Sequence, residues 1–99
     1  MRIGGQIQPP TLLRRIEPTY PPMAVSAHLQ GMVILEAIVD EEGTVTDVKV
    51  LRSVNPLLDR EALAAVRQWR YSPVVLNGRP VPFVLSVSLS FSLRERDQG

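Results

Sequence analysis

The chain has 99 residues, a formal net charge of +1, 44% hydrophobic residues and no cysteine. This length fits one small domain and excludes a second core or a separate cofactor domain. The eleven basic residues are scattered along the chain, which disfavours the dense basic face of a nucleic-acid-binding protein. Without cysteine there is no disulfide framework and no thiolate site. No apolar run approaches the ~20 residues needed to span a bilayer.

Residues 1–11 have the composition of a linker. They combine glycines, which resist ordering, with prolines, which favour extended geometry. We expect them to end a flexible tether, followed by a folded domain over residues 12–94 and a charged tail over residues 95–99. At the start of the domain, residues 12–16 could pair as a minor strand.

A short helix and a hairpin are predicted next. A proline suits the first position of a helix over residues 22–29, and Gly31 ends it. Residues 32–40 are apolar and β-branched, which predicts a strand, and the acidic turn that follows leads into a second strand over residues 44–52. A three-residue step breaks the alternation in that second strand and indicates a bulge. The valines that define it are Val45, Val48 and Val50.

The second half of the chain predicts a helix, a tight hairpin and a long strand. Asn55-Pro56 is typical of an N-cap followed by proline at the first helical position. Asn77-Gly78 predicts a type I′ turn between residues 74–76 and 79–81. Residues 81–93 alternate between apolar side chains and mostly serine, which predicts a strand with one buried face and one wet face. The apolar face of the helix comprises Leu58, Ala62, Ala65, Val66 and Trp69.

The predicted fold is α+β with the element order αββαβ, a three-stranded antiparallel sheet carrying two helices on one face. The hairpin strands are antiparallel, and the second helix returns the chain so that the last strand runs parallel to the second. In an all-antiparallel sheet the last strand therefore pairs with the first, giving the order second, first, third. The last strand is then an edge, and a long alternating edge invites strand addition by a peptide or by another copy.

The side chains that could bind a metal, catalyse a reaction or stack on bases are better explained by structural roles. His28 is the lone histidine, so neither a zinc site nor a catalytic triad is expected. The acidic run at residues 40–42 fits a hairpin turn rather than an EF-hand loop, and the serines of the last strand have no base beside them. Trp69 and Tyr71 fit core packing rather than base stacking. We therefore expect no enzyme activity, no cofactor and no metal.

Three apolar side chains of the first predicted hairpin strand would be exposed to solvent unless another segment covers them. Met32, Ile34 and Ile38 would point away from the helices, on the same face as the serines. Because monomers rarely expose a large apolar patch, either residues 12–16 fold over these three side chains or the side chains form an apolar contact surface. We hypothesise that residues 12–16 cover them.

A series of short motifs runs through residues 16–93. They are Pro18-Thr19-Tyr20-Pro21, Ala24, Gly31-Met32-Val33, Asp40-Glu41-Glu42-Gly43-Thr44-Val45, Leu51-Arg52-Ser53, Leu58-Asp59-Arg60-Glu61-Ala62-Leu63, Val66-Arg67-Gln68-Trp69-Arg70-Tyr71-Ser72-Pro73, Asn77-Gly78 and Phe91-Ser92-Leu93. Together they resemble the C-terminal domain of the TonB energy transducers. The αββαβ order agrees with the fold of that family.

The resemblance implies a mechanical coupler. Such proteins are anchored in the inner membrane by an N-terminal helix, cross the periplasm on a proline-rich spacer and grip the TonB box of outer-membrane receptors, which couples inner-membrane energy to nutrient transport, including siderophore transport. ExbB and ExbD type motor partners would act through an N-terminal region that precedes Met1, so the chain would be the periplasmic piece of a longer protein.

The resemblance also points to site residues. In the family the receptor segment adds as a strand beside the last strand of the domain, which matches the predicted edge. Glu17 occupies a place where family members carry glutamine near the receptor. The candidate receptor-binding residues of the last strand are Val84, Ser86, Val87, Ser88, Leu89 and Ser90.

Other functions use the same features. A dimerisation or scaffold module would pair the same edge with a second copy, and the sequence does not separate this homodimer from a receptor-binding domain. A single-strand nucleic-acid binder is disfavoured by the scattered charge, and a hydrolase would need a base beside its nucleophile.

Overall fold

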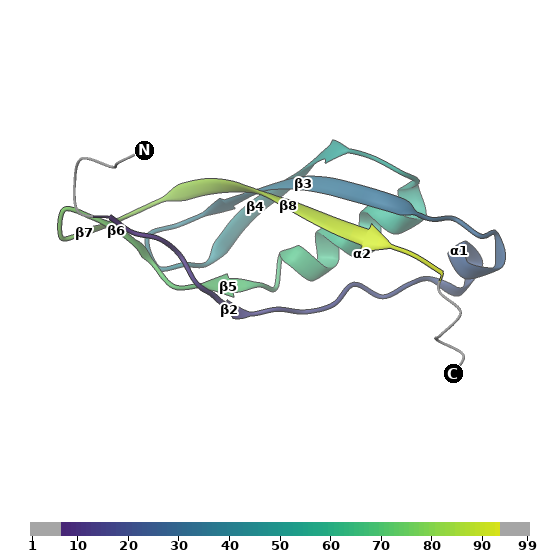
Figure 1. Cartoon of the computed structure of the whole chain (residues 1–99), viewed down its shortest axis with the longest axis horizontal. Coiled ribbons are helices and arrows are strands. Elements are labelled where there is room, and N and C mark those ends of the chain that lie inside the picture. Colours follow the sequence, from purple (N-terminus) through teal and green to yellow (C-terminus); the bar gives the residue numbers. More distant parts are fainter. Residues whose placement is uncertain (1–6, 94–99) are drawn as a thin grey trace.

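The computed structural model describes residues 7–93 and has an elongated fold built on a three-stranded antiparallel sheet (Figure 1). The order of its strands is β4–β3–β8, with β3 in the middle. This is the order second, first, third expected from the sequence. The strands are β3 (Gly31–Val39), β4 (Val45–Arg52) and β8 (Phe83–Phe91).

Both helices contribute to one core on one side of this sheet. The longer helix, α2 (Pro56–Val66), packs against β3 and β4, and the short helix α1 (Pro22–Ser26) adds the buried Ala24. The α+β prediction is therefore confirmed. No helix among residues 7–93 is both long and apolar enough to cross a membrane. The central buried side chains are Val33, Leu35, Val39, Leu58, Val66 and Leu89.

The predicted bulge in the second hairpin strand is confirmed. Ile38 lies opposite Asp47 while Val39 lies opposite Val45, so Thr46 is the extra residue. Without this extra residue, strict alternation would turn Val45 to the wet face. The bulge keeps it in the core together with Val48.

Helix α2 begins where its capping residues predict and ends earlier than expected. The side chain of Asn55 accepts a hydrogen bond from the backbone N–H of Leu57 at 2.9 Å, and proline occupies the first turn. The helix ends at Val66, so Trp69 is not on its apolar stripe. Trp69 is nevertheless buried, because the turn after the helix directs its indole back into the core.

Helix α1 is also shorter than the predicted range 22–29. It ends at Ser26, and His28 lies in the left-handed region with a φ of 56°. A residue in that conformation cannot continue a right-handed helix. Gly31, expected to end the helix, is instead the first residue of β3.

Two small sheets, which were not predicted as such, extend the fold. In one, residues 7–8 pair with the hairpin whose turn has positive φ at Asn77 (52°) and Gly78 (82°), which confirms the expected type I′ turn. In the other, the predicted minor strand near residue 12 pairs with a two-residue strand that follows α2. The elements are β1 (Ile7–Gln8), β6 (Val74–Leu76) and β7 (Arg79–Val81), then β2 (Leu12–Arg14) and β5 (Arg70–Tyr71).

These pairings bear on the domain limits. Strand β1 lies inside the range 1–11 that its composition predicts to be linker. Residues 1–6 and 94–99 lie outside the described residues, so the linker and the charged tail stay predictions.

The hypothesis that the N-terminal segment covers the outer face of the sheet is wrong. Ile16 and Tyr20 pack against the core on the helix side instead, because the carbonyl of Ile16 accepts the indole N–H of Trp69. On the outer face Ile34 and Ile38 are half-buried by their neighbours, and Met32 stays 48% exposed.

Gly43 joins the acidic turn to β5. Asp40 forms that turn as predicted, since its carboxylate accepts the backbone N–H groups of Glu42 and Thr44, each at 2.9 Å. The carbonyl of Gly43 then accepts the N–H of Tyr71 at 2.9 Å. Gly43 has a φ of 89°, and a Cβ there would lie 1.8 Å from the carbonyl oxygen of Tyr71. Only glycine fits this position.

We expect Gly43→Ala to lower the free energy of unfolding by more than about 3 kcal/mol, through backbone strain and the clash with β5. Gly78→Ala is the matched control, since its φ of 82° is similar but its Cβ would meet open space. It should cost only about 1 kcal/mol. Urea unfolding followed by the fluorescence of Trp69, the single tryptophan, measures both. Equal losses would contradict the close approach at Gly43.

Candidate functional site

Strand β8 has one occupied edge and one open edge. It pairs with β3 over its whole length, from Phe83 opposite Val39 to Phe91 opposite Gly31, without a register shift. No other strand among residues 7–93 pairs with it. The second edge of a nine-residue strand is therefore available for backbone hydrogen bonds.

The pairing of β3 determines which residues of β8 have backbone groups at the open edge. In an antiparallel strand, the N–H and C=O of one residue point to the same neighbour, and successive residues alternate. The N–H of Asp40 donates to the carbonyl of Thr44, and the carbonyl of Ile38 accepts from the side-chain hydroxyl of Thr46, so the backbone groups of even-numbered residues there face β4. Odd-numbered residues of β3 then face β8.

It follows that odd-numbered and even-numbered residues of β8 direct their backbone groups to opposite sides. Its odd-numbered residues lie opposite odd-numbered residues of β3 and direct their backbone groups to that strand. Its even-numbered residues direct N–H and C=O outward. The residues at the open edge are Val84, Ser86, Ser88 and Ser90.

The side chains of β8 follow the same division. The even-numbered residues are exposed on the outer face, with Val84 57% exposed. Val87 and Leu89, also predicted as site residues, are buried in the core and face β3. The structure thus separates the six candidate residues of β8 into four at the open edge and two beneath it.

Aromatic contacts hold both ends of β8. Near its start, the rings of Phe83 and Tyr71 meet edge to face at 6.0 Å between centroids, and at its end Phe91 meets Tyr20 at 5.4 Å. Burial raises the pKa of the Tyr71 hydroxyl, an effect that the nearby Arg15 opposes. These contacts pack both ends of β8 against the rest of the core.

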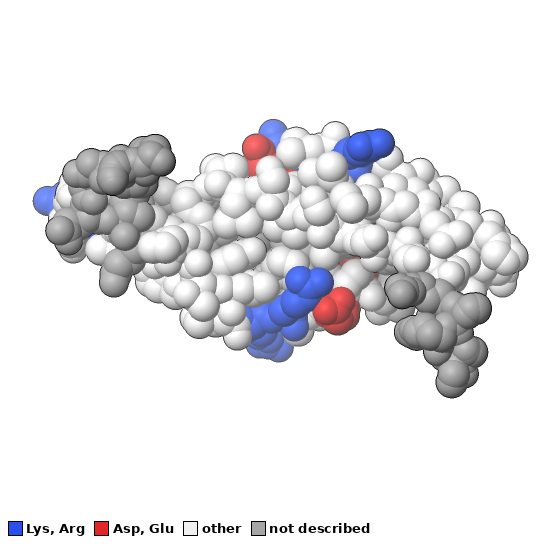
Figure 2. Space-filling model, viewed as in Figure 1, with Lys and Arg blue, Asp and Glu red and all other residues white. Residues whose placement is uncertain are grey.

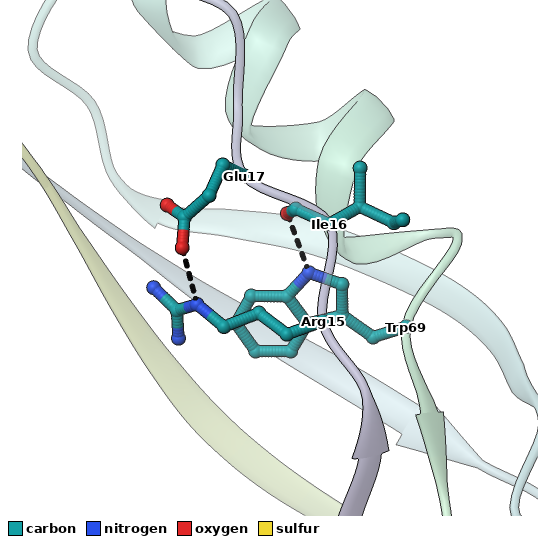
Figure 3. Close-up of polar contacts among 4 residues, drawn as sticks. All are labelled: Arg15, Ile16, Glu17 and Trp69. Atoms are coloured by element: carbon teal, nitrogen blue, oxygen red, sulfur yellow. Dashed lines mark hydrogen bonds and ion pairs between the residues drawn. The ribbon is translucent and has the colours of Figure 1, made fainter.

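Glu17, the remaining predicted site residue, belongs to a polar cluster on the N-terminal segment (Figure 3). Its carboxylate accepts a hydrogen bond from Nε of Arg15 at 2.8 Å, and its side chain is 73% exposed. The guanidinium of Arg15 lies over the ring of Trp69, 4.9 Å from the centroid. The indole N–H of Trp69 donates to the carbonyl of Ile16 at 2.9 Å.

This cluster contains partners that the sequence analysis missed. Glu17 was predicted as a receptor contact and Trp69 as a core residue, whereas Arg15, which contacts both, was not predicted. A buried indole N–H usually has a hydrogen-bond acceptor. The predicted burial of Trp69 therefore indicates that some acceptor lies beside it. The acceptor lies 53 residues away along the chain, so spacing alone could not identify it.

The described residues offer backbone pairing rather than a metal centre. Among residues 7–93 no three His, Cys, Asp or Glu side chains are grouped so that they could hold a metal ion. The serines of β8 lie in a row on one strand face. The arrangement can therefore bind an extended chain through main-chain groups.

Comparison with known proteins gives the family. The model of the family described as Gram-negative bacterial TonB protein C-terminal matches residues 16–93. The chain belongs to this TonB C-terminal family. The matched segment runs from Ile16, which contacts Trp69, to two residues beyond the end of β8.

Several TonB proteins are similar in sequence. Protein TonB of Xanthomonas campestris pv. campestris is 42% identical over 77 residues, which cover 77% of this chain and 34% of that protein. Protein TonB of Vibrio cholerae is 31% identical over 87 residues, covering 87% of this chain and 36% of that protein. The chain thus spans about a third of the length of these relatives.

A solved structure supports the fold. The solution NMR structure of the Pseudomonas aeruginosa TonB CTD superposes with a TM-score of 0.74 at 31% identity, covering 88% of this chain and 89% of that chain. The two share the α+β arrangement with a three-stranded antiparallel sheet.

We expect Trp69→Phe to cost about 1–3 kcal/mol of unfolding free energy, because the carbonyl of Ile16 loses its partner and a gap remains. Arg15→Gln should cost less than about 1 kcal/mol, since it removes only an exposed ion pair and a surface cation–π contact. Urea unfolding followed by circular dichroism measures both. A loss for Arg15→Gln as large as that for Trp69→Phe would mean that the ion pair, and not the indole, holds the segment.

Proposed function

We propose that this domain binds an extended segment, the TonB box, of an outer-membrane receptor by adding it as a fourth strand beside β8. The observation that supports this proposal best is the open edge, where four alternate residues direct backbone donors and acceptors outward. Family membership supports the choice of partner. Coupling of inner-membrane energy to outer-membrane transport is the role that follows.

The expected affinity is modest. Four outward residues offer about eight backbone hydrogen bonds, each with a net value of ~0.5–1.5 kcal/mol, against an association cost of ~4–15 kcal/mol. Main-chain recognition also tolerates varied side chains, which suits a domain that serves several receptors. When the added strand is pulled along its axis, its backbone hydrogen bonds to β8 carry the load together rather than one at a time.

Glu17 is proposed as a side-chain contact to the same segment. It projects from the N-terminal segment, and in the view of Figure 3 it and Arg15 extend toward β8. Its carboxylate is largely exposed, so a receptor backbone N–H could replace part of its hydration. Val87 and Leu89 act indirectly, by fixing β8 on the core.

The wider setting is part of the proposal. The described domain would lie in the periplasm, within a protein anchored in the inner membrane by a preceding helix and energised by ExbB and ExbD type partners. Residues 1–11 would end its spacer, residues 12–94 would form the domain, and residues 95–99 would be a charged tail. Relatives about three times longer than the matched region support a larger protein.

The proposal predicts that Ser88→Pro weakens binding of a TonB-box peptide about tenfold or more. Proline removes the outward N–H at the centre of the edge but leaves the pairing with β3 intact. Ser88→Ala is the matched control and should bind normally, because it keeps the backbone. NMR titration of the labelled domain measures binding and should shift the amides of residues 84–90.

Three outcomes would contradict strand addition. One is normal binding by Ser88→Pro, and another is a set of shifts that spares β8. The third concerns the alternative function as a dimerisation module: light scattering that finds a stable dimer, indifferent to added peptide, would assign the edge to a second copy.

A further inference from the structure

Two arginines face each other on a surface outside β8. The register of the β2–β5 ribbon places Arg14 opposite Arg70, after a shift in which Leu13 is the extra residue of β2. Residues opposite each other in an antiparallel pair project to the same face, with Cβ atoms about 4.5–5.5 Å apart. Both side chains are exposed, and like charges in this position destabilise the pair. The ribbon therefore places two like charges on the same face, which is unfavourable.

No carboxylate of the described residues relieves this repulsion. The ion pairs within residues 7–93 are Arg15 with Glu17 and Lys49 with Glu36. The nearest carboxylate along the chain, Glu17, is thus already bound to Arg15. The acidic turn before β4 reaches Arg70 only through a backbone bridge at Thr44, and its Asp40 binds backbone amides instead.

The backbone beneath the two arginines is fixed on both sides. Thr11 and Ser72 exchange two hydrogen bonds, from the N–H of Thr11 to Oγ of Ser72 at 2.8 Å and from the N–H of Ser72 to the carbonyl of Thr11 at 2.9 Å. On the other side, the N–H of Tyr71 donates to Gly43. The two side chains thus extend from an ordered backbone, so binding does not have to order the ribbon itself.

An exposed apolar side chain adjoins them. Leu13 precedes Arg14 in β2 and is 64% exposed. Figure 2 shows basic atoms gathered over β2 and the segment after it. Leu13, Arg14 and Arg70 together form what we call the arginine patch.

We propose that the arginine patch binds an acidic segment of a partner protein, with carboxylates on the two guanidinium groups and an apolar side chain on Leu13. Arginine binds carboxylates through two parallel hydrogen bonds, and an incoming carboxylate converts the repulsion of Arg14 and Arg70 into attraction for both. The repulsion between Arg14 and Arg70 that destabilises the free domain is thus relieved when the acidic segment binds.

Other anionic partners fit less well. Peripheral membrane binding without a lipid anchor requires clusters of four to eight basic residues or a large apolar face. The patch provides two free cations and one leucine. Nucleic acid would need a dense basic surface, whereas the whole chain has a net charge of +1.

The binding test uses a fluorescein-labelled peptide of alternating Asp, Glu and Leu residues and its Asn, Gln and Leu counterpart. At low salt the acidic peptide should bind with a salt-dependent affinity, and R14Q/R70Q should weaken it about three- to tenfold. The matched control R52Q/R60Q removes the same charge from exposed positions outside the patch and should change the affinity less than twofold. The neutral peptide should not respond to either variant.

A stability measurement separates this role from a structural one. Because Arg14 and Arg70 repel, Arg14→Gln should raise the urea midpoint of the domain at low salt, and added salt should remove the gain. Arg52→Gln should not raise it. A residue whose loss strengthens the fold while weakening binding serves the partner rather than the fold.

Several results would overturn the proposal. These are equal affinities of R14Q/R70Q and R52Q/R60Q for the acidic peptide, no binding of that peptide at low salt, or a lowered urea midpoint for Arg14→Gln. Binding to phosphatidylglycerol vesicles that R14Q/R70Q abolishes, without any response to the peptide, would assign the patch to a membrane. Since no residue of β8 takes part, the Ser88→Pro result is independent of all of these.

Discussion

The central strand β3 determines most of what this domain can do. It is paired on both sides, with β4 through a short hairpin and with β8 through the connection that includes α2. Since the connection through α2 carries the chain back to the end of the sheet where β4 begins, β8 must run antiparallel to β3 and parallel to β4. Antiparallel pairing throughout is satisfied only if β8 lies beside β3. The strand that arrives last is therefore left at the margin, with one edge open.

Backbone and side-chain alternation coincide along that open edge. The residues whose backbone groups point outward are the same ones whose side chains lie on the exposed face, while the intervening residues pair with β3 and fill the core. The strand is thus held firmly by every second residue. A guest strand would meet the backbone of the others, three of which are serines whose small side chains offer little steric hindrance. This combination explains how an exposed edge can be both rigid and accessible.

The N-terminal segment closes the helix side of the core and contributes charge near the sheet. Its position depends on the indole of Trp69, which donates to the carbonyl of Ile16 and supports the guanidinium of Arg15. The same segment continues from β2, where Arg14 faces Arg70 across the ribbon. Neighbouring arginines are therefore in different states, one neutralised by Glu17 and two without a carboxylate among the described residues.

The sequence by itself determined the elements whose signals are local. Asn55 and Pro56 mark the start of α2, Asn77-Gly78 gives a turn with positive φ at both residues, and the valine spacing of β4 records its bulge. The alternation of β8 predicted its buried face, and connection rules predicted its place at the edge. The family resemblance rested on motifs of the same local kind.

Only the tertiary structure decided the features that depend on residues far apart in the chain. The N-terminal segment was expected on the outer face of the sheet, but it lies on the helix side because its backbone satisfies a buried indole 53 residues away. The facing arginines likewise come from strands joined by neither a turn nor a motif. Hydrogen bonds within a turn or helix leave a pattern in nearby residues, whereas a contact between distant strands depends on the packing of everything between them.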